Sequence, residues 1–109
     1  MMPGGFSIEQ ERLGAGHRLV LQGELDLAAA YDLETALGGL LGDGLPIELD
    51  LLGVTFMDSM GMRSLLTARD MCDEQGSALT VIAGEGQRKM LEVTGLIEVL
   101  PLHGGETDV

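Results

Sequence analysis

The sequence predicts an α/β fold, in which a mostly parallel sheet of about five short strands starts with a hairpin and carries about three helices. Apolar segments typical of strands recur along the chain. The first two of these predicted strands follow each other directly, and each later strand is preceded by a segment whose apolar residues have helical spacing. Glycines mark most of the junctions. The 109 residues, 45% of them hydrophobic, suit one compact core. We expect a single domain at 6–102, between tails at 1–5 and 103–109.

The first two predicted strands form the hairpin. Residues 6–12 alternate weakly between apolar and polar side chains, and the glycines of residues 13–16 supply a flexible turn before a strand at about 17–22. His17 starts that strand, where we expect an ordinary surface residue; neither it nor His103 is assigned a catalytic or metal-binding role. Asp26 then occupies an N-cap position before a helix at about 27–41.

Residues 47–70 carry the most informative pattern. Ile47, Leu49 and Leu51 alternate with acidic residues, as in a strand with one buried face, and Gly53 is expected to end that strand. A helix is predicted at about 59–75, because small and apolar residues recur there at helical spacing. The members of this packing stripe are Gly61, Leu65, Ala68 and Cys72.

The later elements are predicted from shorter patterns. A nearly continuous apolar run at 78–83 is typical of a strand covered on both faces. A third helix is expected at about 87–94, ending at Gly95, and a final strand at 97–100, before Pro101. Cys72, the single cysteine, has no internal disulfide partner and is expected to be a small core residue.

Asp58 and Ser59 lie where the strand-to-helix connection ends, and both residue types cap helices well. A helix cap is therefore the simplest interpretation. The second interpretation is a modifiable hydroxyl on a partner-binding surface, because Met57, Met60 and Met62 would surround Ser59 with a deformable apolar rim. The residues by themselves leave both interpretations open.

The segment Met57-Asp58-Ser59-Met60-Gly61, with the strand before it, resembles the signature of the bacterial anti-sigma factor antagonists, which are small single-domain members of the STAS group. Gly23-Glu24-Leu25-Asp26 resembles the element that these proteins carry before their first helix. Met90-Leu91-Glu92-Val93-Thr94-Gly95-Leu96 resembles their third helix and its end. The resemblance covers about residues 6–102 and implies a single STAS domain.

The resemblance also implies a binding module controlled by phosphorylation. The unphosphorylated form would bind an anti-sigma factor with serine kinase activity and so free a sigma factor for transcription, as in a stress response. Phosphorylation of Ser59 would prevent binding, and a metal-dependent serine phosphatase would reverse it. We expect a partner surface of Asp26, Met57, Asp58, Ser59, Met60, Gly61 and Arg63, in which the resemblance implies the contribution of Asp26. Arg63 lies one helical turn after Ser59, where it either pairs with the phosphate or is simply an exposed helical arginine.

Two departures and two alternatives accompany this prediction. We expect no counterpart in residues 103–109 of the C-terminal helix with which family members commonly continue, and Met60 stands where relatives often have another small hydroxyl residue. A constitutive STAS subunit of a transport or signalling assembly, in which Ser59 only caps the helix or contacts a partner, would have the same fold and motif. An enzyme with Ser59 as nucleophile is disfavoured, because the glycine two residues before the serine of a nucleophile elbow is missing.

Composition narrows the classes of partner. Six basic and 18 acidic side chains give a net charge of -12, which repels nucleic acid and anionic lipid and favours a partner with a basic surface. No secretory signal and no apolar run of membrane-spanning length is visible, so a cytoplasmic protein is expected. We expect no cofactor and no metal site, and a monomer or weak dimer.

Overall fold

The computed structural model describes residues 5–103. Within them lie a five-stranded sheet of order β1-β2-β3-β4-β5, three α-helices and two 3-10 helices. In chain order the elements are β1 (Phe6–Leu13), β2 (Gly16–Leu25), α1 (Leu27–Leu40), η1 (Leu41–Asp43), β3 (Ile47–Met57), α2 (Ser59–Gln75), β4 (Leu79–Ile82), α3 (Glu85–Thr94), η2 (Leu96–Glu98) and β5 (Leu102–His103). The predicted tails at 1–5 and 103–109 lie outside the described residues, except for Gly5 and His103.

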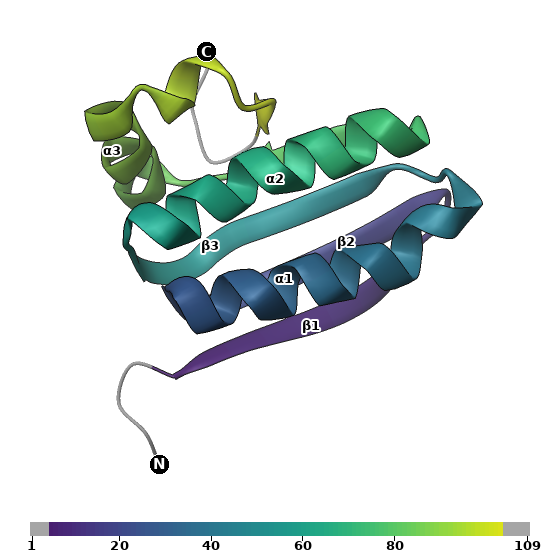
Figure 1. Cartoon of the computed structure of the whole chain (residues 1–109), viewed down its shortest axis with the longest axis horizontal. Helices are drawn as coiled ribbons and strands as arrows, with labels where there is room; N and C mark the ends of the chain where they lie inside the picture. Colours follow the sequence, from purple (N-terminus) through teal and green to yellow (C-terminus); the bar gives the residue numbers. More distant parts are fainter. Residues whose placement is uncertain (1–4, 104–109) are drawn as a thin grey trace.

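The sheet is mixed, as predicted. β1 and β2 form an antiparallel hairpin, and each later strand pairs parallel with the one before it. α1 and α2 lie side by side over one face of the sheet, and α3 packs near the end of β3 (Figure 1). Because β2 and β3 are parallel, α1 and α2 both begin at the same end of the molecule, which is the left end in Figure 1.

Alternation in the two central strands builds the core. Leu19 and Leu21 of β2 and Leu49 and Leu51 of β3 are all fully buried, and Leu19 pairs with Leu49 across the ladder. The intervening side chains point to the opposite face, because successive strand residues alternate. α1 and α2 cover the buried face with small and apolar side chains. The fully buried members from these helices include Leu33, Leu37, Leu65, Ala68 and Cys72.

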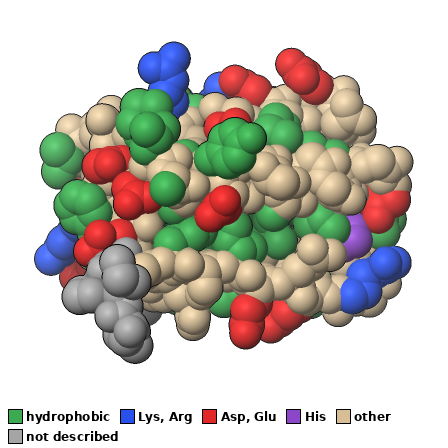
Figure 2. Space-filling view, turned by 60° about the horizontal axis from the view of Figure 1, so that its bottom comes forward, with side chains coloured by type: hydrophobic (Ala, Val, Ile, Leu, Met, Phe, Trp, Pro, Cys, Tyr) green, Lys and Arg blue, Asp and Glu red, His purple; other side chains and the backbone are tan. Residues whose placement is uncertain are grey.

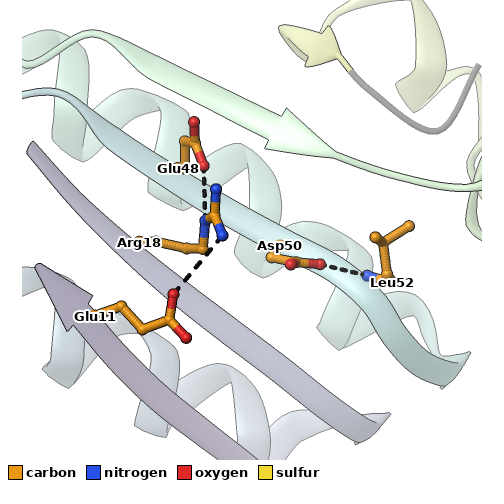
Figure 3. A network of polar contacts seen from close by, with 5 residues as sticks. All are labelled: Glu11, Arg18, Glu48, Asp50 and Leu52. Atoms are coloured by element: carbon orange, nitrogen blue, oxygen red, sulfur yellow. Dashed lines mark hydrogen bonds and ion pairs between the residues drawn. The ribbon is translucent and has the colours of Figure 1, made fainter. Parts of the chain in front are cut away.

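The other face of the sheet carries a polar network (Figure 3). Arg18 Nε donates to Glu48 Oε1 over 2.8 Å, and Arg18 Nη1 lies 3.7 Å from Glu11 Oε1, so the guanidinium links three neighbouring strands. The hydrogen bond and the negative charge of Glu48 raise the pKa of Arg18. Nearby, Asp50 Oδ1 accepts a hydrogen bond from the backbone N–H of Leu52 over 2.9 Å. Charged side chains thus occupy this part of the open face.

β3 continues through Gly53, so the prediction that the strand ends there is wrong. Relative to β2, β3 holds one extra residue near Gly53 and another before Phe56. A Cβ at Gly53 would lie 2.7 Å from Gln22 Cγ, so the glycine allows the two strands to approach at the bulge. β3 therefore ends at Met57, and α2 begins beside the end of β2.

The side chain of Gln87 hydrogen-bonds to the part of β3 that extends beyond β4. β4 pairs only with residues 47–50 of β3, and the Nε2 group of the buried Gln87 donates to the carbonyls of Val54 and Leu52 over 2.8 and 3.3 Å. Its Oε1 accepts from the N–H of Gly84 over 2.8 Å. This bond closes the first turn of α3, which begins at Glu85 and thus two residues before the predicted helix. This role of Gln87 was not predicted from the sequence.

The predicted strand at 97–100 is also wrong. Gly95 ends α3 with a φ of 80°, and the chain then forms η2, since Leu96, Ile97 and Leu100 are spaced to pack on the core as a compact turn. The last strand, β5, follows Pro101, whose carbonyl accepts from the N–H of Val81 over 2.9 Å. Its partner β4 is also less covered than predicted, because only Val81 of its four residues is buried.

His17 is not the surface residue that the sequence predicted. Its side chain faces the helical layer and is only 6% exposed, and its Nε2 lies 2.8 Å from Asp43 Oδ2 of η1. Cys72, by contrast, is fully buried as predicted, and burial raises the pKa of its thiol to about 11. Neither group is placed as an exposed reactive side chain.

Candidate functional site

The candidate site is formed by the two turns in which β2 and β3 end. Leu25 pairs with Met57 at the last position of the two strands, and Asp26 and Asp58 follow directly. The N–H of Asp58 donates to the carbonyl of Leu25 over 3.3 Å, which joins the turns. The structure therefore brings the Asp26 turn and the Asp58–Ser59 turn together, although 32 positions separate the two aspartates in the sequence.

Both aspartates are helix N-caps. Asp26 Oδ1 accepts from the N–H of Ala29 over 3.0 Å, and Asp58 Oδ1 accepts from the N–H of Gly61 over 2.8 Å. Each has extended backbone angles, as N-cap residues usually do. Two carboxylates thus lie on neighbouring turns, each stabilised by the positive end of its own helix. Both aspartates are half-buried, so each remains partly accessible to an approaching group.

Ser59 is the first residue of α2 and is exposed. Because Asp58 caps the helix, the hydroxyl of Ser59 is not needed for that purpose, and within residues 5–103 it makes no hydrogen bond. The helix-cap interpretation therefore applies to Asp58. Ser59 instead presents a free hydroxyl at a helix N-terminus, where unpaired backbone N–H groups and the helix dipole favour a negative group.

Gly61 sets the distance between α2 and the neighbouring turn. It is buried, and a Cβ placed on it would lie 1.8 Å from the carbonyl oxygen of Leu25. Only a residue without a side chain fits this approach. Gly61 thereby holds Ser59 beside the Asp26 turn, and its buried position makes it a supporting residue instead of a contact residue.

The predicted methionine rim is only partly present. Met60 is 41% exposed and Met62 is half-buried, but Met57 is 4% exposed and belongs to the core. Met57 points inward because it follows the alternation of β3 after the second bulge. The prediction that Met57 forms part of an exposed rim is therefore wrong, whereas Met60 lies at the surface beside Ser59.

Arg63 lies one helical turn after Ser59 and is exposed. In the part of the chain that the structure describes, its guanidinium makes no hydrogen bond and no ion pair. It borders two grooves on either side of the solvent-facing stripe of α2. One, of about 490 Å³, runs from Ser59 past Met62 and Leu66 to Leu96, and the other, of about 190 Å³, separates α2 from α1.

The geometry does not assemble a hydrolytic triad around Ser59. His17 lies at the opposite end of β2 from Asp26, and His103 lies in β5, separated from β3 by β4. No group of three or more His, Cys, Asp or Glu side chains in the described part of the chain is arranged to hold a metal ion. None of the helices in residues 5–103 is long and apolar enough to cross a membrane.

Leu27 and Tyr31 of α1 lie next to this site, although neither was predicted from the sequence to be a site residue. Both border the groove between α1 and α2, together with Met60 and Arg63. The available signal was their spacing of four residues on the side of the helix opposite the apolar packing stripe. Large apolar residues at such positions indicate a surface that another molecule covers.

Comparisons with known proteins agree with this architecture. Residues 8–101 match the model of the family described as "Mlab, STAS domain". The crystal structure of an anti-sigma factor antagonist from Mycobacterium paratuberculosis is 27% identical, with a TM-score of 0.80 over 94% of this chain and 88% of that one. No curated protein sequence matches.

The antagonist SpoIIAA is more distant in sequence. Its unphosphorylated form is 19% identical, with a TM-score of 0.72 over 94% of this chain and 90% of that one. The phosphorylated form of the Bacillus protein has the same identity and a TM-score of 0.65, over 94% and 93% of the two chains. At this identity the likeness concerns the fold.

Proposed function

Since this chain belongs to the STAS-domain family and has the fold of the anti-sigma factor antagonists, we propose that it is itself such an antagonist. Its unphosphorylated form binds an anti-sigma factor, which then releases its sigma factor, and transcription from the corresponding promoters rises. The protein acts by competition for a partner and not by turnover. The observation that carries the proposal is the exposed hydroxyl of Ser59, which makes no hydrogen bond within residues 5–103 and directly follows the capping residue Asp58, on a turn bonded to the one that holds Asp26.

The proposed contact surface follows from exposure. Asp26, Asp58, Ser59, Met60 and Arg63 are accessible to a partner, while the buried Met57 and Gly61 hold them in place. A partner with a basic surface suits the two carboxylates and the net charge of -12. Charge complementarity of this kind speeds encounter and disfavours acidic competitors.

Phosphorylation of Ser59 would switch the surface off. A phosphoserine brings about 1.5 to 2 negative charges to a contact that already holds Asp58 and, across the joined turns, Asp26. Like charges forced together in an interface cost several kcal/mol, at about 1.4 kcal/mol for each tenfold loss of affinity. The isolated fold tolerates the phosphate, because the N-terminus of α2 favours anions. Modification therefore breaks binding without unfolding the protein.

The enzymes of the switch are separate proteins in this proposal. The anti-sigma partner is the ATP-dependent serine kinase that modifies Ser59, and a metal-dependent serine phosphatase reverses the modification. ATP and metal ions belong to those two partners. The chain itself needs only an accessible serine and a surface that the phosphate can disrupt.

The first test is the intact mass of the protein isolated from its own cells, with fragmentation to locate any phosphate. One phosphate on Ser59 that varies between growth, starvation and stress is the expected result. Absence of phosphate under all three conditions would argue for the alternative, a constitutive STAS subunit of a transport or signalling assembly.

A binding measurement completes the test. Each serine-kinase anti-sigma factor encoded in the same genome is purified and titrated with the unmodified protein, with Ser59→Ala and with Ser59→Asp. We expect tight binding of the first two and a loss of at least about tenfold for Ser59→Asp, as for a charged group placed against like charges. Equal affinity of all three would contradict a phosphorylation switch at this position.

A further inference from the structure

Large hydrophobic side chains are exposed where α1 and α2 begin. Leu27 is 61% exposed, Tyr31 is 73% exposed and Met60 is 41% exposed. Figure 2 shows hydrophobic side chains among acidic ones at this end of the molecule, which is on the left in both views. Scattered exposed apolar residues need no explanation, but a group of them around one groove indicates a binding surface.

These three side chains border the same groove between α1 and α2. It has a volume of about 190 Å³, and Glu34 and Arg63 also line it. Arg63 and Thr67 belong to this groove and to the larger one that starts at Ser59. The α1–α2 groove is therefore continuous with the surface on which the proposed function depends, and extends it onto a helix that contains no part of the Asp58–Ser59 motif.

We propose that the anti-sigma partner inserts an apolar side chain, flanked by a Lys or Arg, into the α1–α2 groove, with Tyr31 as the principal anchor on this chain. The proposal rests on the proposed function and deepens it by naming the chemistry of the partner segment. The apolar lining from Leu27, Tyr31 and Met60 fits an aliphatic or aromatic side chain. Glu34 on α1, and the net charge of -12, fit the flanking cation.

Tyr31 has the properties of an anchor in a protein interface. Tyrosine offers a large amphipathic surface with few rotatable bonds, and it is enriched among the residues whose truncation weakens complexes most. Tyr31 lies on a regular helix and needs no rearrangement to be presented. Its exposure also means that replacing it leaves the core of the protein unchanged.

The experiment measures the affinity of the purified serine-kinase anti-sigma factor for the full chain by calorimetry. Tyr31→Ala is compared with Val93→Ala, a matched control on α3 whose side chain is 86% exposed and borders neither groove. Glu34→Gln is compared with Glu92→Gln, an exposed glutamate of α3. Ser59→Asp reports on the switch independently. Sedimentation of each variant without the partner follows self-association.

Tyr31→Ala is expected to weaken binding by at least about tenfold, and Glu34→Gln by a smaller factor that shrinks as salt is raised, while both controls bind like the unmodified chain. Unchanged affinity of Tyr31→Ala beside a weakened Ser59→Asp would overturn the groove proposal and leave the proposed function standing. Loss of self-association by Tyr31→Ala, with unchanged partner affinity, would assign the groove to a second copy and overturn it too. Failure of the unmodified chain to bind any such partner would overturn both proposals.

Discussion

At the scale of single residues, the candidate site depends on one glycine, one capping aspartate and two exposed polar side chains. Gly61 lets α2 approach the carbonyl of Leu25. Asp58 caps the helix, so the hydroxyl of Ser59 is not needed as a cap and makes no hydrogen bond to any residue that the structure describes. Arg63 lies one turn further along, with no ion pair among the described residues. These local arrangements give each residue a separate and testable contribution.

Replacing Gly61 by alanine is expected to lower the free energy of unfolding by about 2 kcal/mol or more, because the new Cβ would lie 1.8 Å from a backbone oxygen and overpacking of this kind costs roughly 1–3 kcal/mol. Urea denaturation followed by circular dichroism measures the change. Gly39→Ala in α1 is the control, since its Cβ would meet nothing within 4 Å. That variant should gain roughly 0.5–1 kcal/mol from helix propensity. Equal stability of both variants would contradict the close approach.

Replacing Arg63 by alanine is expected to destabilise the Ser59-phosphorylated protein selectively, by roughly 0.5–1 kcal/mol. The reason is that residues four apart on a helix are neighbours, so the guanidinium can pair with the phosphate. Thermal denaturation of both forms of the wild type and the variant measures the difference. Arg63→Lys, which keeps the charge, should retain most of the effect. An equal loss in both forms would mean that Arg63 acts only as an exposed helical residue.

At the scale of elements, the site is placed by the lengths of neighbouring strands. β3 is longer than β4, and its two extra residues relative to β2 bring Met57 level with Leu25. The side chain of Gln87 bonds the β3 carbonyls that β4 leaves without a strand partner. The start of α3 and the end of β3 are thereby fixed to each other.

Gln87→Leu is therefore expected to destabilise the fold by about 1–3 kcal/mol, because it leaves the carbonyl of Val54 without its donor in a buried position. Gln87→Glu should be at least as costly, since a carboxylate cannot donate to that carbonyl. Urea midpoints measure both. Gln75→Leu, at the exposed end of α2, is the control and should change stability by less than about 0.5 kcal/mol. A harmless Gln87→Leu would show that water serves these carbonyls equally well.

At the scale of the whole molecule, an excess of carboxylates is distributed over a small fold whose net charge is -12. Asp43 ties the connection after α1 to the start of β2. Its Oδ1 accepts from the N–H of Leu45 over 3.0 Å, and its Oδ2 lies 2.8 Å from His17 Nε2. The hydrogen bond from Leu45, and then that from His17, lower the pKa of Asp43 below its ordinary value.

A lowered pKa in the folded state means that ionised Asp43 stabilises the fold above the ordinary aspartate pKa of 3.8, and that this contribution disappears as the pH falls through the folded-state value. Compared between pH 5 and pH 3, the stability advantage of the wild type over Asp43→Asn should thus shrink as the pH falls below about 4. Urea denaturation of both proteins across this range measures it. An advantage that is independent of pH would show that the carboxylate charge contributes nothing.

The features predicted correctly from the sequence are those that depend on interactions between residues a few positions apart. The α2 helix has the predicted bounds, because Asp58 caps it, Gly76 ends it in the left-handed region and its packing stripe has a regular period. Asp26 is the predicted N-cap for the same kind of reason. The order of strands and helices also follows from local periodicity, as does the burial of Cys72.

The incorrect predictions concern residues whose role depends on a distant neighbour. Gly53 was predicted to end a strand but lies at a bulge against Gln22. His17 was predicted at the surface but meets Asp43, 26 positions away. The segment 97–100 forms part of a compact turn, because its apolar residues pack on a core that local sequence does not describe. The same limitation hid Gln87, whose partners on β3 are 33 and 35 positions away.

By itself, then, the sequence determined the fold class, the helix caps at Asp26 and Asp58, and the family resemblance around Ser59, since capping and periodicity act over a few residues. Only the tertiary structure decided that these two caps lie on joined turns, that Met57 is buried, and that Leu27 and Tyr31 border a groove beside Ser59. Those features arise from the parallel pairing of β2 with β3 and the packing of α1 against α2, which bring together residues about 30 positions apart.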